Sequence, residues 1–127
     1  MSNNPSGELA LKTIAMPANT NANGDIFGGW IVSQMDIAAC ILGKQKAKGK
    51  VVTVAIDAMS FHQPVKVGDI VSCFCSLLKI GDSSMKINVE TWITDHTSEE
   101  HQKVTEGEFT LVAINEHGRP RGVLSRD

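Results

Sequence analysis

Hydrophobic and polar residues follow two different periods along this chain. Between about Gly24 and Lys44, apolar residues recur at steps of three and four, which is the spacing of one face of an α-helix. Other apolar residues lie off this stripe, so we expect the helix to be buried on nearly every side. The stripe consists of Phe27, Trp30, Ile31, Met35, Ala38, Ile41 and Leu42, and the residues off it are Ile26, Val32, Ile37 and Ala39.

The ends of the predicted helix carry charges that suit its dipole. Asp25 falls in the first turn, where a carboxylate faces the positive end of the helix dipole, and residues 44–50 (KQKAKGK) place lysines and a glycine near the other end.

Before the helix, residues 8–16 (ELALKTIAM) predict a short strand. Residues 17–25 (PANTNANGD) are rich in turn formers and predict an irregular loop that leads into the helix.

After residue 50 the pattern changes to β-branched and alternating residues. Four such stretches, separated by turn residues, predict strands at 51–62, 69–80, 83–94 and 103–114. The third stretch alternates apolar and polar residues, as in a sheet with one covered face. No second helix is available to build parallel crossovers. We therefore expect an α+β fold in which a five-stranded antiparallel sheet wraps around one long central helix.

Length and charge narrow the class of protein. The chain has 127 residues, 42% of them hydrophobic, which is enough for one domain. Its formal net charge is −2, without a block of like charges, so we expect neither a nucleic-acid nor a membrane partner. The start lacks the pattern of a signal peptide, which predicts a cytoplasmic protein. We expect a flexible leader at 1–7, one domain at 8–121 and a flexible tail at 122–127.

The placement of cysteine and histidine argues against a metal site. Cys73 and Cys75 lie two apart in a predicted strand and share one face, which is typical of small buried residues rather than of zinc ligands. The sequence lacks the motifs GxGxxG, GxxxxGKS/T, HExxH and GxSxG, so we expect no metal, no flavin or nucleotide cofactor and no serine nucleophile. The histidines are scattered over a strand end and turns, at His62, His96, His101 and His117.

Three segments resemble one known family. They are AMPANTNANGDIFGGWIVSQMD, VVTVAIDAMSFHQPVKVGD and SSMKINVETW, and the likeness extends over about residues 8–121. In these segments the chain resembles the YciA-type acyl-CoA thioesterases. The resemblance implies the hot-dog fold and the hydrolysis of acyl-CoA to a free acid and CoA in fatty acid metabolism, with no cofactor beyond the CoA of substrate and product. It also implies a homodimer with active sites at the subunit interface, and usually a hexamer built as a trimer of dimers.

Asp36 is the only charged residue between Phe27 and Gly43. A carboxylate in an apolar helix needs a partner or a purpose, because burying it without either is costly. In a structural role, Asp36 would cap a neighbouring loop or face water. In a catalytic role, it would act at a thioester carbonyl as a general base or as a nucleophile. The family resemblance favours the catalytic role and leaves base and nucleophile open.

The start of the helix is the predicted oxyanion site. Gly28 and Gly29 would expose backbone N–H groups at the positive end of the helix dipole, and the alternative is that they only allow close packing. Asp36 follows Gly28 by two turns, about 12 Å along the axis, which is too far for both to hold one carbonyl. We therefore expect the helix start of one subunit to face Asp36 of the other in a dimer.

Further residues are candidates for assisting catalysis or binding substrate. Polar loop residues would orient the water or the carbonyl, and turn formation is the alternative role for each of them. Pantetheine is expected to run between the helix and the strand at 51–62, with lysines at the rim for the nucleotide. The candidates are Asn23 and Asp25 as catalytic helpers, Asn21, Phe27, Thr53, Met59, Ser60 and Phe61 as substrate contacts, and Lys79 or Lys86 at the rim.

The chain departs from the YciA pattern at several positions. Close relatives have two glycines just after the aspartate, whereas this chain has Ala38 and Ala39, followed by Cys40. Asn19 stands where relatives often carry Asp. The extra methyl groups would narrow the acyl pocket or shift a subunit contact, so we expect them to affect the preferred chain length.

Two other functions fit the same scaffold less well. A non-catalytic acyl-CoA binder or sensor would have no use for a water-activating carboxylate at Asp36. A dehydratase or hydratase would need a histidine in the loop or at the helix entry, where this chain has none. For His62 we expect a structural or pocket-lining role.

Overall fold

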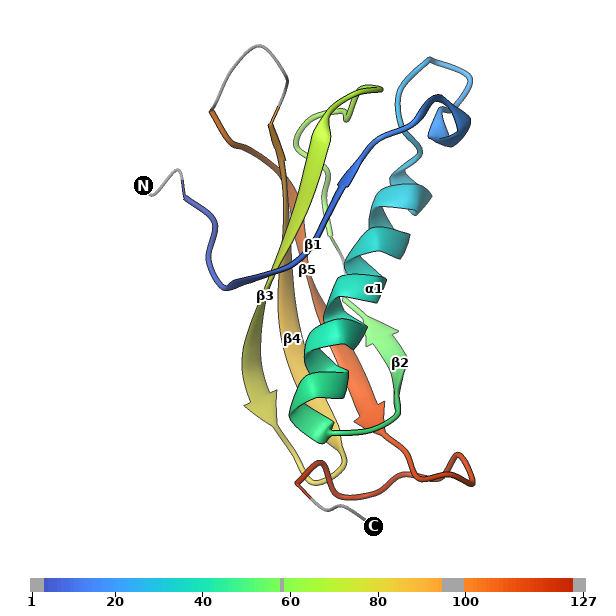
Figure 1. Ribbon diagram of the computed structural model, residues 1–127, viewed down its shortest axis with the longest axis vertical. Coiled ribbons are helices and arrows are strands. Elements are labelled where there is room, and N and C mark those ends of the chain that lie inside the picture. Colours follow the sequence, from blue (N-terminus) through green and yellow to red (C-terminus); the bar gives the residue numbers. More distant parts are fainter. Residues whose placement is uncertain (1–3, 58, 95–99, 125–127) are drawn as a thin grey trace.

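The computed structural model describes residues 4–57, 59–94 and 100–124 of the chain (Figure 1). His96 therefore lies outside the described residues. Within the described part, one α-helix and five strands account for the regular structure, with a short 3₁₀ turn before the helix. In chain order the elements are β1 (Glu8–Ile14), η1 (Pro17–Asn19), α1 (Gly28–Ala47), β2 (Val51–Ile56), β3 (Ile70–Ile80), β4 (Ser84–Thr94) and β5 (Gln102–Ala113).

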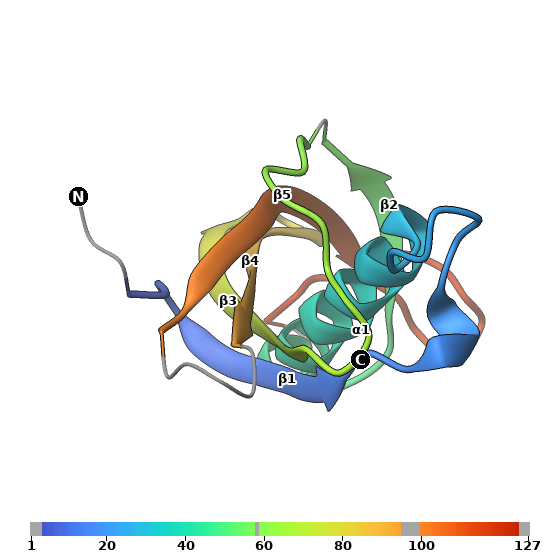
Figure 2. The same ribbon diagram turned by 90° about the horizontal axis from the view of Figure 1, so that it is seen from above.

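The five strands form one antiparallel sheet in the order β1-β3-β4-β5-β2. Seen from above, the sheet curves around α1, with β1 and β2 as its two edges (Figure 2). The register shifts in each strand pair, and such irregularities bend a strand and increase its twist. The expected α+β arrangement of a wrapped antiparallel sheet around one long helix is confirmed.

The core fills the space between α1 and the concave face of the sheet. Gly43 allows a close approach here, because a Cβ atom at this position would lie 2.8 Å from Cδ2 of Leu111. Burial of these side chains holds the helix in place, at roughly 25 cal/mol for each Å² of apolar surface removed from water. The core includes Ile31, Met35, Ala38, Ala39 and Leu42 of α1 and Met85, Ile87, Val89, Phe109 and Leu111 of the sheet.

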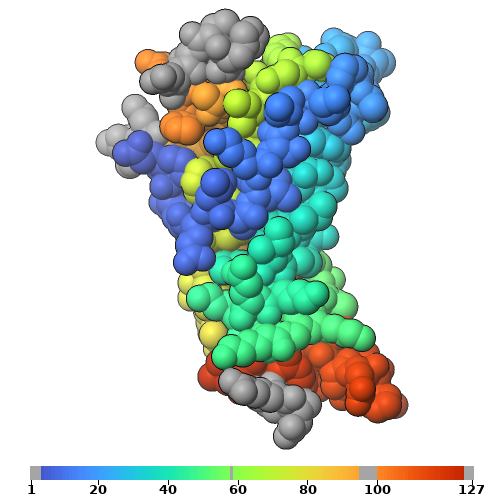
Figure 3. All heavy atoms as spheres, viewed as in Figure 1, coloured from blue at the N-terminus to red at the C-terminus, as the bar shows by residue number. Residues whose placement is uncertain are grey.

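The prediction that the helix is buried on nearly every side is wrong for the single chain. Atoms of α1 reach the surface along its length (Figure 3), and Ile37 and Ile41 are 48% and 36% exposed. The helix also begins at Gly28, so Asp25 lies in the preceding loop and the first turn contains no acidic residue. Lys44 and Lys46 do lie in the last turn, as the dipole argument predicted.

The stretch 51–62, expected to be one strand, is regular only as far as Ile56. Beyond this point the chain follows β5 through separate hydrogen bonds instead of a continuous ladder. The N–H of His62 donates to the carbonyl of Val104 at 2.8 Å, and Oγ1 of Thr105 donates to the carbonyl of Ser60 at 2.7 Å. The segment around Phe61 therefore forms an irregular arm beside the start of α1.

The two cysteines of β3 are buried, as expected for small core residues. Cys73 and Cys75 are 0% and 1% exposed. Desolvation raises the pKa of the Cys73 thiol to about 11 and that of the Cys75 thiol to about 12. Both groups are therefore uncharged near neutral pH.

Among the described residues, we also find no helix with the length and apolar character needed to cross a membrane.

Part of the segment expected to be a flexible tail at 122–127 is packed against the domain. Val123 is 2% exposed, and its N–H donates to the carbonyl of Asp82 at 2.9 Å. Just before it, the guanidinium of Arg121 donates to the carbonyl of Ala47 at 2.7 Å, so it satisfies one of the free carbonyls at the end of α1. Residues 125–127 lie outside the described part.

The Arg121 contact predicts a measurable role in stability. We expect Arg121→Ala to lower the free energy of unfolding by about 1–2 kcal/mol, because a partly buried, charge-assisted hydrogen bond to the helix end is lost. Urea unfolding at fixed protein concentration measures this change. Arg119→Ala, at an exposed position in the same segment, is the matched control and should change the free energy by less than about 0.5 kcal/mol. Equal effects of the two changes would contradict the capping role.

Candidate active site

Asp36 is held by a side chain from the neighbouring edge strand. Oγ1 of Thr53, on β2, donates a hydrogen bond to Oδ1 of Asp36 at 2.6 Å. Sγ of Cys40 lies 3.6 Å from the same threonine oxygen. Asp36 and Cys40 are one helical turn apart and therefore project from the same face of α1. We call these three residues, Asp36, Thr53 and Cys40, the aspartate cluster.

An open cavity of about 250 Å³ adjoins the aspartate cluster. Apart from Asp36 and Lys44, its lining is Ile37, Cys40 and Ile41, which all come from the exposed side of α1. Among the described strands, the neighbouring strand β2 pairs only with β5, so its other edge carries backbone groups without a strand partner there. The carboxylate thus lies at the wall of an apolar hollow beside a free sheet edge.

A second cavity, of about 430 Å³, lies at the start of α1. Neither the Gly28 N–H nor the Gly29 N–H has an acceptor among the described residues, and no side chain caps this helix end. The glycine at position 28 faces Phe61, since a Cβ atom there would lie 3.6 Å from the ring. The cavity is lined by Asn21, Asp25, Ile26, Gly28, Ile31, Phe61, His62, Gln63, Pro64 and Val65.

The polar loop residues are partly used to build the loop itself. Oδ1 of Asn21 accepts the N–H groups of Asn23 at 2.8 Å and of Asp25 at 3.2 Å. The carboxylate of Asp25 pairs with Nζ of Lys66 at 2.5 Å, which ties the loop to the segment after Phe61. Asn23 is exposed. The alternative role of turn formation is therefore real for Asn21, and Asp25 anchors the loop.

The two parts of the predicted site do not meet within one chain. Asp36 lies eight positions after Gly28 on a rigid helix, or about 12 Å along the axis. The two cavities share no lining residue. Of the predicted site residues, the structure groups Asn21, Asp25, Gly28 and Phe61 at one cavity and Asp36 with Thr53 at the other, while Phe27 is exposed at the helix start.

Four predicted substrate contacts lie away from both cavities. Met59 packs over Gly107, where a Cβ atom would lie 2.5 Å from the methionine Cε, and Ser60 is exposed with its carbonyl bonded to Thr105. Lys86 alternates with buried residues of β4, so it faces away from the helix, and it pairs with Glu108 at 3.5 Å. Lys79 is its register partner on β3. Within one chain the structure does not bring these residues to the site.

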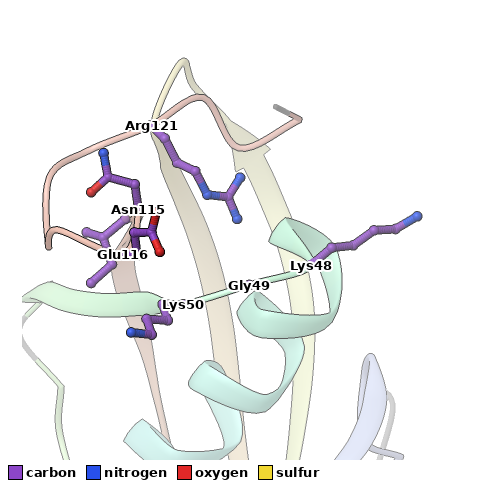
Figure 4. A pocket seen from close by; sticks show the side chains of 7 residues that line it. Lys48, Gly49, Lys50, Asn115, Glu116 and Arg121 are labelled. Atoms are coloured by element: carbon purple, nitrogen blue, oxygen red, sulfur yellow. The ribbon is translucent and has the colours of Figure 1, made fainter. Parts of the chain in front are cut away.

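Sequence reasoning missed two features of the site region. The first is the link from Cys40 through Thr53 to Asp36, which no local pattern signals. The second is a cavity of about 610 Å³ at the far end of α1, between the turn after the helix and the C-terminal segment (Figure 4). It shares no lining residue with the other two cavities, so it is not part of the candidate active site. It is lined by Lys48, Gly49, Lys50, Ile114, Asn115, Glu116 and Arg121.

The histidines and the acidic residues do not gather into a metal centre in the described part of the chain. No group of three or more His, Cys, Asp or Glu side chains there has the arrangement to hold a metal ion. His62 lines the cavity at the start of α1, in line with the pocket-lining role expected for it. His101 instead lies with its Nδ1 atom 3.1 Å from Oγ1 of Thr94.

Comparison with known proteins places the chain in a family. Residues 23–100 match the model of the thioesterase superfamily. The YciA acyl-CoA thioester hydrolase of Salmonella typhimurium is 52% identical over 124 residues, which cover 95% of this chain and 93% of the relative. The chain therefore belongs to the thioesterase superfamily, in the family of the YciA acyl-CoA thioester hydrolases.

Solved structures agree with this placement. The hexameric thioesterase y2039 of Yersinia pestis is 53% identical and superposes with a TM-score of 0.90, over 95% of this chain and 98% of that one. The hexameric hot-dog fold thioesterase Cj0915 of Campylobacter jejuni is 36% identical, with a TM-score of 0.85 over 91% of this chain and 90% of that one. The fold is thus the hot-dog fold, which the sequence resemblance implied.

Ala38 and Ala39 are both fully buried in the core, and neither lines the cavity beside Asp36. We therefore expect the double change of Ala38→Gly and Ala39→Gly to lower the free energy of unfolding by about 2–4 kcal/mol, through lost helix propensity and lost methyl packing. Urea unfolding measures the loss. Ser33→Gly, at an exposed position of α1, should cost about 0.5 kcal/mol. A shifted acyl chain-length profile at unchanged stability would contradict the packing role and restore the original expectation.

Proposed function

We propose that this chain hydrolyses acyl-CoA thioesters to a free carboxylic acid and CoA. The observation that carries the proposal is the position of Asp36, a lone carboxylate at the wall of an open apolar cavity with one oxygen held by Thr53. Such a cavity suits an acyl chain, and a fixed carboxylate beside it suits a reaction at the thioester carbonyl. Membership in a family of acyl-CoA thioester hydrolases supports the same reaction.

Asp36 acts either as general base or as nucleophile. As a base, it takes a proton from water while the water oxygen attacks the carbonyl carbon; the C–S bond then breaks, and the proton passes to the leaving CoA sulfur. As a nucleophile, its oxygen attacks the carbonyl carbon and displaces CoA, and water then hydrolyses the resulting anhydride. In both routes Thr53 holds one carboxylate oxygen, so the other one faces the substrate.

The oxyanion is stabilised at the start of α1. The N–H groups of Gly28 and Gly29 lack acceptors among the described residues, and the helix dipole favours negative charge at this end. Phe61 forms one wall of the cavity there and is the best placed contact for pantetheine. Asn23 is exposed in the loop and is available to orient water or the carbonyl, whereas Asn21 and Asp25 shape the loop.

Each active site is shared by two subunits. The distance of about 12 Å along α1 prevents Asp36 from meeting its own helix start, so a partner must supply that half. Exposed apolar side chains on α1 and β2 and the unpaired edge of β2 favour such a partner, and the two solved relatives are hexamers. We propose a dimer that assembles into a trimer of dimers. The exposed apolar residues are Ile37, Ile41, Val52, Val54 and Ile56.

The runner-up function is non-catalytic acyl-CoA binding. It predicts CoA binding without thiol release by the wild-type chain, so a thiol-release assay over short, medium and long acyl-CoAs distinguishes binding from hydrolysis.

The hydrolysis that we propose needs no cofactor beyond the CoA of the substrate. We also propose the cytoplasm as its compartment, because Cys40, Cys73 and Cys75 are all free thiols.

Replacing the carboxylate at constant size tests the catalytic role. We expect Asp36→Asn to lower kcat at least about 10²-fold with a much smaller change in CoA binding, because the base or nucleophile is lost and the Thr53 contact can persist. Asp82→Asn, in the exposed turn between β3 and β4, is the matched control and should keep normal kcat. Near-normal hydrolysis by Asp36→Asn would show that this carboxylate is a structural partner.

Subunit mixing tests the shared site. Gly28→Pro should remove one oxyanion donor and keep the helix, because proline suits the first helical position and Phe27 already has an extended backbone with ψ 134°. We expect both Gly28→Pro and Asp36→Asn chains to be weakly active alone. Random mixing should restore about one quarter of the wild-type rate, because half of the dimers are mixed and each mixed dimer has one intact site.

The control for this experiment is each variant refolded or coexpressed with itself, which should show no gain. Native mass spectrometry reports whether mixed dimers have formed. If mixed dimers are present and the rate stays at the level of the parent variants, both halves of the site come from one chain and the proposal fails.

A further inference from the structure

Cys40 contacts the threonine that holds the catalytic carboxylate. Its Sγ atom lies 3.6 Å from Oγ1 of Thr53, and that oxygen lies 2.6 Å from Oδ1 of Asp36. Cys40 also lines the same open cavity as Asp36. The thiol is thus one hydrogen bond removed from the carboxylate and close to the reacting groups.

The number of protons fixes the direction of these two hydrogen bonds. An ionised carboxylate, the form required of a base or nucleophile, only accepts. Thr53 has one hydroxyl proton, and the short contact to Asp36 uses it. The threonine oxygen can still accept through a lone pair, so the Cys40 thiol is the donor. The chain of donors therefore runs from the Cys40 S–H to the Thr53 O–H and on to Asp36.

We propose that Cys40 is a positioning residue for hydrolysis, which acts through Thr53 to hold Asp36. This inference rests on the proposed function of Asp36. Donation by the thiol fixes the rotation of the Thr53 hydroxyl and polarises its O–H bond, which strengthens the next hydrogen bond in the chain. A well-positioned carboxylate stabilises the transition state of the chemical step, so the loss of Cys40 should lower kcat and leave substrate binding nearly unchanged.

The core contains a matched contact that has no link to the site. Sγ of Cys73 lies 3.6 Å from Oγ1 of Thr91, the same distance and the same pair of atoms, between β3 and β4. Loss of this thiol should lower stability because Cys73 is fully buried. It should leave kcat unchanged. Cys73→Ala therefore measures the effect on kcat of losing a cysteine–threonine contact when the threonine does not hold the catalytic carboxylate.

The test is a double-mutant cycle on kcat. We expect Cys40→Ala to lower kcat about three- to tenfold with KM nearly unchanged, the range of one modest hydrogen bond. Cys40→Ser keeps a donor and should retain most of the wild-type kcat. In a Thr53→Val background, Cys40→Ala should cause no further loss, because the residue through which it acts is gone. Thr53→Ala serves as a second background if Thr53→Val fails to fold.

Several outcomes would overturn the proposal. These are an unchanged kcat in Cys40→Ala, an equal loss in Cys40→Ser, or the same factor of loss with and without the Thr53 hydroxyl. A fall in kcat with Cys73→Ala as large as that with Cys40→Ala would also overturn it. Failure of the proposed function shows differently: a wild-type chain without thiol release, or normal hydrolysis by Asp36→Asn, refutes the catalytic assignment and the role of Cys40 with it.

Discussion

The packing of α1 against the concave face of the sheet determines every other feature of the site. The helix has small buried residues at Ala38 and Ala39, and Gly43 lies so close to β5 that a Cβ atom there would be 2.8 Å from Cδ2 of Leu111. A close-packed interface of this kind permits one position of the helix. That position brings Asp36 within hydrogen-bond distance of Thr53 on β2 and aims the helix start at the arm that carries Phe61.

The stiffness of the same helix separates the two halves of the proposed active site. Asp36 and the free N–H groups at Gly28 and Gly29 lie on one continuous helix, which fixes the distance between them, so they cannot approach each other within one chain. The apolar side chains that α1 leaves exposed, Ile37 and Ile41, lie beside the carboxylate. The proposed shared site and the burial of these apolar side chains therefore both favour a second subunit against this face.

Polar contacts adjust the geometry that packing sets. On one side, Thr53 holds Asp36, and Cys40 in turn contacts Thr53. On the other side, Asn21 closes the loop through two backbone N–H groups, and the Asp25–Lys66 pair fastens that loop to the chain after Phe61. Such exposed pairs contribute little to stability, so their value lies in orienting the helix start.

The sequence by itself determined the helix, the strands and the lone carboxylate of α1, because side-chain periodicity and charge are local properties that one segment displays alone. It did not determine where β2 ends, that Asp25 lies outside the helix, or that Arg121 and Val123 pack against the domain. It also did not link Cys40 to Asp36 through Thr53. The element ends and these contacts depend on residues that are far apart in the sequence, and only the tertiary packing of α1 on the sheet decides which of them meet.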